Sequence, residues 1–196
     1  WMQILHGEHR MQFFDALPPS GKLLNKTQVV SVVDKGAGKG ALVTTVRDVS
    51  DAVTGKPLAR VEHVSFCRAD GGYSASSAPS DAPLPALPAA PDRAPDLQLD
   101  MPTLKNAALL YRLNGDRNPI HAVPIAWKKA GFNQPILHGL CTFGMAARGL
   151  VKLLCADAPQ RLKSIAARFS SPVFPGETLV LWVWCADGET LHFEVH

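Results

Sequence analysis

Short hydrophobic runs separated by polar turns occupy the first third of the chain and predict β-strands. β-branched residues dominate 29–33, 42–46 and 61–66, and turn-forming residues at 34–40 and 51–57 separate these runs. None of these segments has the three-to-four-residue spacing of an amphipathic helix. We therefore expect an antiparallel sheet with an apolar face that nothing else in this part of the chain covers.

The last third of the chain predicts one long helix followed by strands. Apolar side chains recur on one helical face over 140–154, while Arg148 and Lys152 fall on the other face. Three strands follow Pro159, and the last of them alternates apolar and polar residues. These strands are 165–169, 179–184 and 191–196. A helix against an antiparallel sheet is an α+β architecture.

A proline-rich segment separates the two parts. Residues 71–102 contain seven prolines in a background rich in Ser, Ala and Asp. Prolines at this density fix φ and remove backbone donors, so that neither a helix nor a sheet propagates. We predict an extended linker at 71–102 that joins a β-rich unit at 1–70 to a second unit at 103–196.

Composition and charge exclude several classes of protein. The 196 residues are 46% hydrophobic and 19% charged, which is too apolar for a disordered chain. Twenty basic and 17 acidic residues give a net charge of +3, so nothing favours nucleic acid as a partner. The four cysteines are far apart and form no CxxC pair, and no membrane span or signal peptide is evident. We expect free thiols in a reducing, cytoplasmic setting.

The segment 111–142 carries the candidate chemistry. Turn-forming residues at 114–119 bring Asp116 and His121 close together on an irregular loop. A carboxylate and an imidazole there can hold one water between them and move protons in both directions. The alternative is structural, because Asp116 can form an Asx turn and His121 can bind a backbone group.

Gly139 stands at the expected cap position of the long helix, directly before Leu140. No Ser, Thr or Asp is present to cap this helix, so its first amides stay free. Free N–H groups at a helix N-terminus suit a developing oxyanion. The alternative is that glycine is needed only for close packing of the helix on the sheet.

Several ordered motifs resemble one family of enzymes. The runs 114–121 (NGDRNPIH) and 135–142 (PILHGLCT), with Gly131-Phe132 between them, resemble the MaoC-like (R)-specific enoyl-CoA hydratases. Within that family they are similar to the two-hotdog hydratase 2 enzymes of bacteria and of peroxisomal multifunctional proteins. Leu5-His6-Gly7-Glu8, Asp34-Lys35-Gly36 and residues 168–179 extend the resemblance over nearly the whole chain.

The resemblance implies a double hotdog, in which an antiparallel sheet wraps around a central helix. Residues 1–70 would be a truncated, non-catalytic first hotdog, and 103–196 the catalytic one. It also implies reversible hydration of trans-2-enoyl-CoA to (3R)-3-hydroxyacyl-CoA, in fatty acid metabolism. The expected enzyme is a homodimer without metal or redox cofactor, cytoplasmic in a bacterium or peroxisomal in a eukaryote, with CoA entering as part of the substrate.

The same resemblance assigns roles to individual residues. Asp116 and His121 would be the catalytic pair, without deciding which of them is the base, and the amide of Gly139 would bind the thioester oxygen. Five further residues would line the acyl-CoA site: His6, Gly7, Lys35, Asn118 and Phe169. A flexible lysine suits the phosphates of CoA, although Lys35 is equally compatible with an exposed turn.

The chain departs from the family pattern in two places. Val123 stands where the family usually has an aspartate, two residues after the catalytic histidine, so we expect altered support for this loop. The opening helix of the first hotdog and a strand beyond His196 are also expected to be missing.

Other functions were weighed against hydration. A hotdog thioesterase would bind the same acyl-CoA but attack the carbonyl carbon, and a decayed paralogue would bind without turnover.

Gly36–Gly40 lacks the GxxxxGK[ST] spacing of a phosphate loop and predicts a hairpin turn. His6 and His9 do not form an HExxH motif and no cysteine or carboxylate cluster accompanies them, so we expect no zinc site.

Overall fold

The structure is a computed structural model that describes residues 4–76, 79–186 and 190–196. The chain divides into two compact units, each described here by itself. The first unit contains the residues up to Ala86 together with Ala158–Ser170, and the second contains Leu87–Asp157 and Ser171–His196. Among the described residues, no helix is long and apolar enough to cross a membrane.

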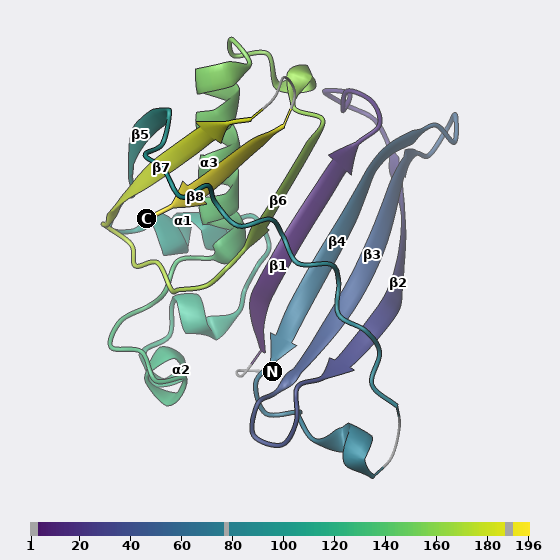
Figure 1. Cartoon of the computed structure of the whole chain (residues 1–196), viewed down its shortest axis with the longest axis vertical. Helices are drawn as coiled ribbons and strands as arrows, with labels where there is room; N and C mark the ends of the chain where they lie inside the picture. Colours follow the sequence, from purple (N-terminus) through teal and green to yellow (C-terminus); the bar gives the residue numbers. More distant parts are fainter. Residues whose placement is uncertain (1–3, 77–78, 187–189) are drawn as a thin grey trace. The chain divides into compact units, whose positions relative to one another are not determined.

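The first unit is a five-stranded antiparallel sheet with the strand order β2-β3-β4-β1-β6 (Figure 1). The three strands predicted from β-branched runs are present as β2, β3 and β4, and each is longer than its run. No helix longer than a single 3₁₀ turn occurs in the described part of this unit. The strands are β1 Ile4–Phe13, β2 Leu23–Asp34, β3 Ala41–Asp51, β4 Pro57–Cys67 and β6 Ser164–Arg168.

Strand β1 was not predicted, because its sequence is largely polar. It lies between β4 and β6 and pairs with both of them. The pairing with β4 shifts register between His6 and Glu8, so Gly7 is the extra residue of a β-bulge. A side chain at position 7 would crowd the Val64 carbonyl, since an ideal Cβ there lies 3.3 Å from that oxygen.

The proline-rich segment is extended at 79–85, as predicted, and protects the edge of the sheet. β2 is an edge strand, and the segment binds it through Asp81, whose carboxylate accepts the Val32 N–H at 2.7 Å while its own N–H donates to the Val32 carbonyl. The Ser31 hydroxyl donates to the Ala82 carbonyl at 3.1 Å. Such contacts occupy the hydrogen-bonding groups that an edge strand exposes.

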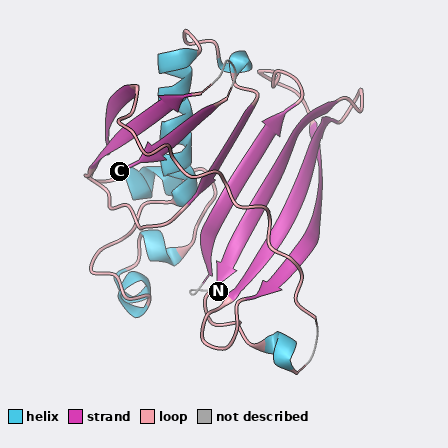
Figure 2. Ribbon diagram, viewed as in Figure 1, coloured by secondary structure: helices cyan, strands magenta, loops and turns pink. Residues whose placement is uncertain are grey.

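The second unit packs one long helix against a three-stranded antiparallel sheet of order β5-β7-β8 (Figure 2). Helix α3 (Gly139–Leu154) and strands β7 (Thr178–Cys185) and β8 (Leu191–Val195) match the predicted elements. An ideal Cβ built on Gly149 of α3 falls 2.7 Å from Leu181 and 3.3 Å from Leu99, so this glycine permits the close approach. Helix and sheet bury Phe143, Ala146, Leu150, Leu179, Leu181 and Val183.

The structure differs from the predicted segments 71–102 and 103–196 at two places. Residues 97–102, predicted as linker, form strand β5 (Leu97–Pro102), which pairs with β7; its proline stands at the last position, where a missing N–H costs least. Residues 158–170, predicted with the second unit, carry β6 and belong to the first unit. Sequence order does not reveal this return of the chain to β1.

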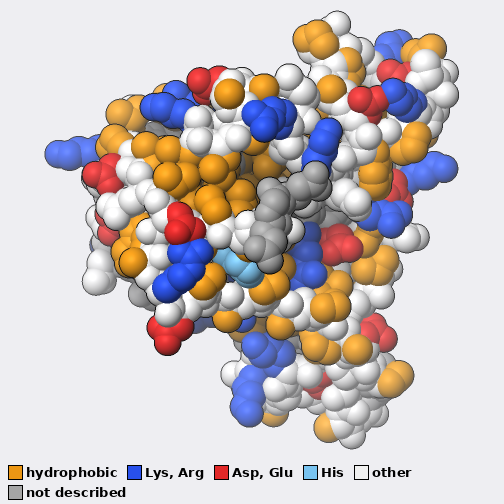
Figure 3. Space-filling view, turned by 45° about the horizontal axis from the view of Figure 1, so that its top comes forward, with side chains coloured by type: hydrophobic (Ala, Val, Ile, Leu, Met, Phe, Trp, Pro, Cys, Tyr) orange, Lys and Arg blue, Asp and Glu red, His pale blue; other side chains and the backbone are white. Residues whose placement is uncertain are grey.

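Short helical segments complete the second unit around the candidate site. They are α1 (Ala107–Arg112), the 3₁₀ turn η2 (Pro119–His121) and α2 (Pro124–Lys129). Two further 3₁₀ turns in the first unit are η1 (Tyr73–Ala75) and η3 (Pro159–Arg161). On the face shown in Figure 3, Lys and Arg side chains are interspersed with Asp and Glu, which agrees with the small net charge.

Candidate active site

The loop that carries Asp116 is built by two successive side-chain-to-backbone hydrogen bonds. Asp116 Oδ1 accepts the N–H of Asn118 at 3.1 Å, which is the expected Asx turn. Asn118 Oδ1 then accepts the N–H of Ile120 at 3.2 Å and caps the 3₁₀ turn that ends at His121. Gly115, with φ of 109°, turns the chain into this loop. The sequence NGDRNP thus fixes the path from Asp116 to His121.

The imidazole of His121 is buried and held in one orientation. The residue is 8% exposed, and Nδ1 lies 2.8 Å from the carbonyl oxygen of Ile136. A carbonyl only accepts, so the neutral ring carries its proton on Nδ1 and has its lone pair on Nε2. The backbone-binding role of His121 and its role as a base are therefore compatible.

His138 is the residue that sequence reasoning missed. It is 1% exposed, and its ring stacks on that of His121 with the centroids 3.6 Å apart. Nε2 of His138 lies 3.3 Å from the backbone carbonyl of Asp116, and the Tyr111 ring lies 4.8 Å away. His138 thus joins the loop of Asp116 to the ring of His121. The sequence did contain one signal for His138, because this residue stands directly before Gly139 in the run 135–142 that resembles the family.

The three side chains form one cluster. One carboxylate oxygen of Asp116 and one ring nitrogen each of His121 and His138 lie within 4.8 Å of one another. Hydrogen bonds of about 2.8 Å from two such atoms can meet on a single water. Asp116 is exposed while both imidazoles are buried, so the cluster faces solvent on its carboxylate side.

Burial keeps both imidazoles neutral. Desolvation lowers the pKa of His121 below its usual 6.5, against the opposing effects of the Ile136 hydrogen bond and the Asp116 charge. Desolvation and the neighbouring His121 lower the pKa of His138 to about 4. His121 is therefore available as a proton acceptor at neutral pH.

The Asp116 cluster does not have the geometry of a metal site. The rings of His121 and His138 are stacked with an interplanar angle of 24°, so their in-plane lone pairs run side by side instead of converging. The arrangement suits proton transfer better than ligation.

Gly139 is the first residue of α3, so it lies one position inside the helix and not at the predicted cap position. His138 occupies the N-cap position without a side-chain cap, and the amides of Cys141 and Thr142 turn back to the His138 carbonyl. The Gly139 N–H has no hydrogen-bond partner within the described parts of the chain. A free amide at the start of a 16-residue helix is a donor suited to an oxyanion.

Three of the residues expected to line the acyl-CoA site lie together in the first unit. The rings of His6 and Phe169 are 4.7 Å apart, and the Phe169 amide donates to the Gly7 carbonyl at 2.9 Å. Lys35 lies on the exposed turn between β2 and β3, with Nζ 5.4 Å from the Phe66 ring centroid. Residues 35–40 are a hairpin turn between strands, as predicted, and not a phosphate loop.

The predicted site residues thus fall into two groups. Asp116, Asn118, His121 and Gly139 belong to the second unit, and the structure brings Asp116 and His121 together. His6, Gly7, Lys35 and Phe169 belong to the first unit. Their roles as substrate contacts remain predictions.

Comparison with known proteins decides the family. Residues 86–196 match the MaoC like domain, and residues 1–69 match the MFE-2 hydratase 2 N-terminal domain. The chain belongs to the MaoC-like family. Both the recognised resemblance and the expected α+β hotdog fold are confirmed, because the structure superposes on MaoC-like dehydratases.

Among relatives, 3-hydroxyacyl-thioester dehydratase Y of Mycobacterium tuberculosis is 44% identical over 182 residues, which is 92% of this chain and 61% of that protein. Enoyl-CoA hydratase 2, peroxisomal, of Arabidopsis thaliana is 38% identical over 92% of this chain and 60% of its own length. A crystal structure of a MaoC-like dehydratase from Phytophthora capsici has a TM-score of 0.87 with 41% identity, covering 99% of this chain and 66% of that one. The chain therefore spans about three fifths of the length of these two curated relatives.

Proposed function

We propose that the protein hydrates trans-2-enoyl-CoA reversibly to (3R)-3-hydroxyacyl-CoA, as part of fatty acid metabolism. The single observation that carries the proposal is the Asp116–His121 pair, whose polar atoms lie close enough to share one water. Support comes from relatives named as an enoyl-CoA hydratase and as a 3-hydroxyacyl-thioester dehydratase, which are the two directions of one reaction.

In the proposed mechanism, the pair activates water for addition to C3. Asp116 orients the water, and Nε2 of His121 accepts its proton because Nδ1 is already protonated. The electron pair of the double bond moves toward the thioester, whose oxygen gains negative charge and accepts a hydrogen bond from the Gly139 amide. The proton held by His121 then returns to C2, which leaves both side chains in their starting states.

The residues that the family resemblance assigns to the acyl-CoA site are proposed to contact the substrate. His6, Gly7, Phe169 and Asn118 would line the acyl-CoA site, and the exposed Lys35 ammonium would meet a phosphate of CoA. Addition of water changes no oxidation state overall, so the proposed reaction requires no redox cofactor and uses acid–base chemistry instead of a metal.

Two further proposals concern the surroundings of the enzyme. We propose a homodimer, which light scattering of the purified chain would test. A peroxisomal location is proposed if the source is eukaryotic, because the Arabidopsis relative is named as peroxisomal, and a cytoplasmic one if it is bacterial.

The decisive experiment follows crotonyl-CoA and a long-chain enoyl-CoA by absorbance of the enoyl thioester, with chiral analysis of the product. Hydration lowers this absorbance and gives the 3R alcohol, and Asp116→Asn and His121→Gln should each reduce turnover at least ~100-fold. Arg148→Gln, on the exposed side of α3, serves as a control with unchanged turnover.

Three results would contradict the proposal. Release of free thiol without loss of the enoyl absorbance would indicate a thioesterase. Binding of enoyl-CoA with no turnover, unaltered by Asp116→Asn, would indicate a non-catalytic paralogue. Near-normal turnover in both variants would remove the pair from the mechanism.

A further inference from the structure

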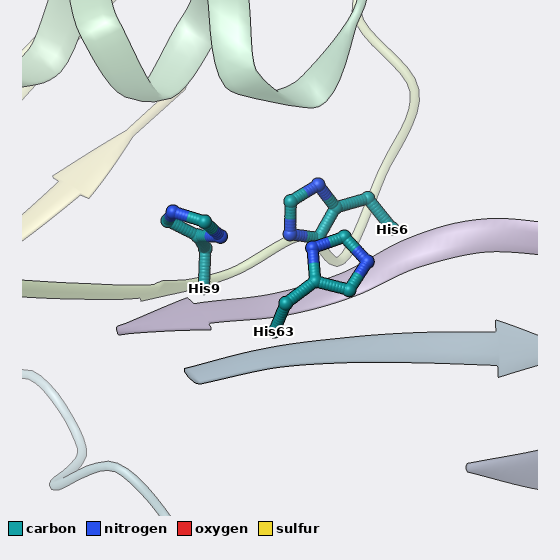
Figure 4. Close-up of side chains that lie close together, drawn as sticks. All are labelled: His6, His9 and His63. Carbon is teal, nitrogen blue, oxygen red and sulfur yellow. The ribbon is translucent and has the colours of Figure 1, made fainter. Parts of the chain in front are cut away.

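A second group of histidines lies in the first unit, and one of its members, His6, is also proposed to line the acyl-CoA site. His6 and His9 come from β1 and His63 comes from β4. One ring nitrogen of each lies within 4.8 Å of the others. Figure 4 shows the three rings above these strands, with a nitrogen of each ring turned toward the space between them.

The β-bulge at Gly7 creates this cluster. Residues three apart on a regular strand point to opposite faces of the sheet, so His6 and His9 would be separated. The extra residue at Gly7 shifts the alternation by one, and both side chains reach the same face. His63 joins them because it is the direct cross-strand partner of His9.

The orientations of the rings favour convergence on one point. His6 is tilted by 45° to His63 and by 74° to His9, and His9 is 85° from His63. Planes inclined in this way can direct their lone pairs to a common centre, unlike the stacked pair His121 and His138. A tetrahedral zinc ion with Zn–N bonds of about 2.0–2.1 Å needs nitrogens ~3.3 Å apart, so the rings would close by at most roughly 1.5 Å.

The hydrogen bonds of the rings leave nitrogens available. Nε2 of His6 is buried and has no hydrogen-bond partner among the described residues, while the ring is hydrogen-bonded to the Glu8 backbone. Nε2 of His63 lies 3.1 Å from the Ser65 hydroxyl, which leaves Nδ1 for a ligand. A backbone or hydroxyl partner on the far nitrogen is the usual support for a metal-binding histidine.

We propose that His6, His9 and His63 form a binding site for one divalent transition-metal ion, with Zn²⁺ as the expected occupant. Three imidazoles with water in the fourth position are an established zinc ligand set, and nitrogen ligands disfavour Mg²⁺ and Ca²⁺. The sequence expectation of no zinc site rested on the spacing of His6 and His9 and on the lack of a cysteine or carboxylate cluster at ligand spacing. The third ligand comes from another strand, 54 positions after His9 in the chain.

The experiment titrates the chelator-treated full chain with Co²⁺, followed by visible absorption, and with Zn²⁺ by calorimetry. The expected result is one ion per chain, with affinity reduced at least ~10-fold in His9→Asn and in His63→Asn. His192→Asn, a matched change on β8 of the other unit, should bind as the unaltered chain does. Zn²⁺ should raise the melting temperature of the unaltered chain and of His192→Asn, but not of His63→Asn.

Arg47 provides a variant whose effect has the opposite sign. Its charge repels a bound cation, so Arg47→Gln should bind Zn²⁺ more tightly, whereas general damage to the sheet would weaken binding. The proposal is overturned if no stoichiometric binding occurs, if both His9→Asn and His63→Asn bind like the unaltered chain, or if His138→Asn abolishes binding instead. All readouts are made without substrate, so their outcome is independent of the proposed hydration.

Discussion

His121 is held on two sides before any substrate arrives. Its Nδ1 is bound to the Ile136 carbonyl and one face of its ring lies against His138. A base whose tautomer and orientation are already set loses little entropy when the reaction begins. The burial that provides this order also lowers the pKa of the ring.

The lowered pKa of His121 predicts the acid limb of the pH–rate profile. The base must be neutral, so kcat/KM falls as pH drops through the folded-state pKa, which lies below the ordinary 6.5. The midpoint of this acid limb should therefore lie below pH 6.5. Steady-state rates between pH 4.5 and 8 measure this, and an acid midpoint at or above 6.5 would contradict it.

Sequence reasoning found the residues whose chemistry is visible in their spacing and missed one whose role depends on the fold. Asp116 and His121 are five positions apart across a turn, and the turn geometry follows from NGDRNP. His138 is 22 positions from Asp116, and its bond to that residue's backbone carbonyl requires the loop to lie beside the start of α3. Local spacing contains no information of that kind.

At the scale of single elements, α3 offers two glycines in contrasting surroundings. Gly149→Ala places a methyl group against buried Leu181 and should destabilise the protein by about 1–2 kcal/mol, since overpacking outweighs the gain in helix propensity. Gly144 is exposed with nothing within 4 Å of an added Cβ, so Gly144→Ala should stabilise by up to ~1 kcal/mol. Urea unfolding of both variants tests the pair. Equal effects would show that α3 does not pack closely at Gly149.

The start of α2 gives a second prediction about an element. Val123 is the N-cap of α2 and makes no side-chain cap, and Pro124 follows at the first helical position. Val123→Asp places a carboxylate oxygen near the free first-turn amides and should raise stability by about 1 kcal/mol. Thermal unfolding measures this, with Val123→Ala as the uncapped control. A melting temperature no higher than that of the control would exclude a capping role for this position.

Elements were predictable where the hydrophobic pattern was strong. α3, β7 and β8 follow from their own periodicity. β1 was not predicted because its sequence, Leu5 to Gln12, contains few apolar residues. It is a strand because it pairs with a neighbouring strand on each side. β5 was not predicted because the prolines before it predict a linker. That proline-rich stretch stops just before Leu97, where pairing with β7 begins. Tertiary pairing overrode local preference in both cases.

For the molecule as a whole, the buried histidines predict acid sensitivity. In the folded chain the pKa values are about 3 for His6 and about 4 for His9 and His138, against 6.5 when unfolded. Between pH 6.5 and 4 the unfolded chain binds more protons, so stability falls as pH falls through this window. The urea midpoint should be lower at pH 5 than at pH 7.5, and His6→Asn should reduce the difference. Equal midpoints at the two pH values would refute this account.

The order of strands in the first unit has a consequence for synthesis of the chain. β1 needs β6 as its second neighbour, and 150 residues, 14–163, lie between these strands in the sequence. While a ribosome is still adding the residues before β6, one border of the nascent sheet stays open to any other extended polypeptide. Folding of this unit therefore has to wait until β6 has been synthesised. Chaperone protection during that interval would matter more here than in a protein whose modules mature one after another.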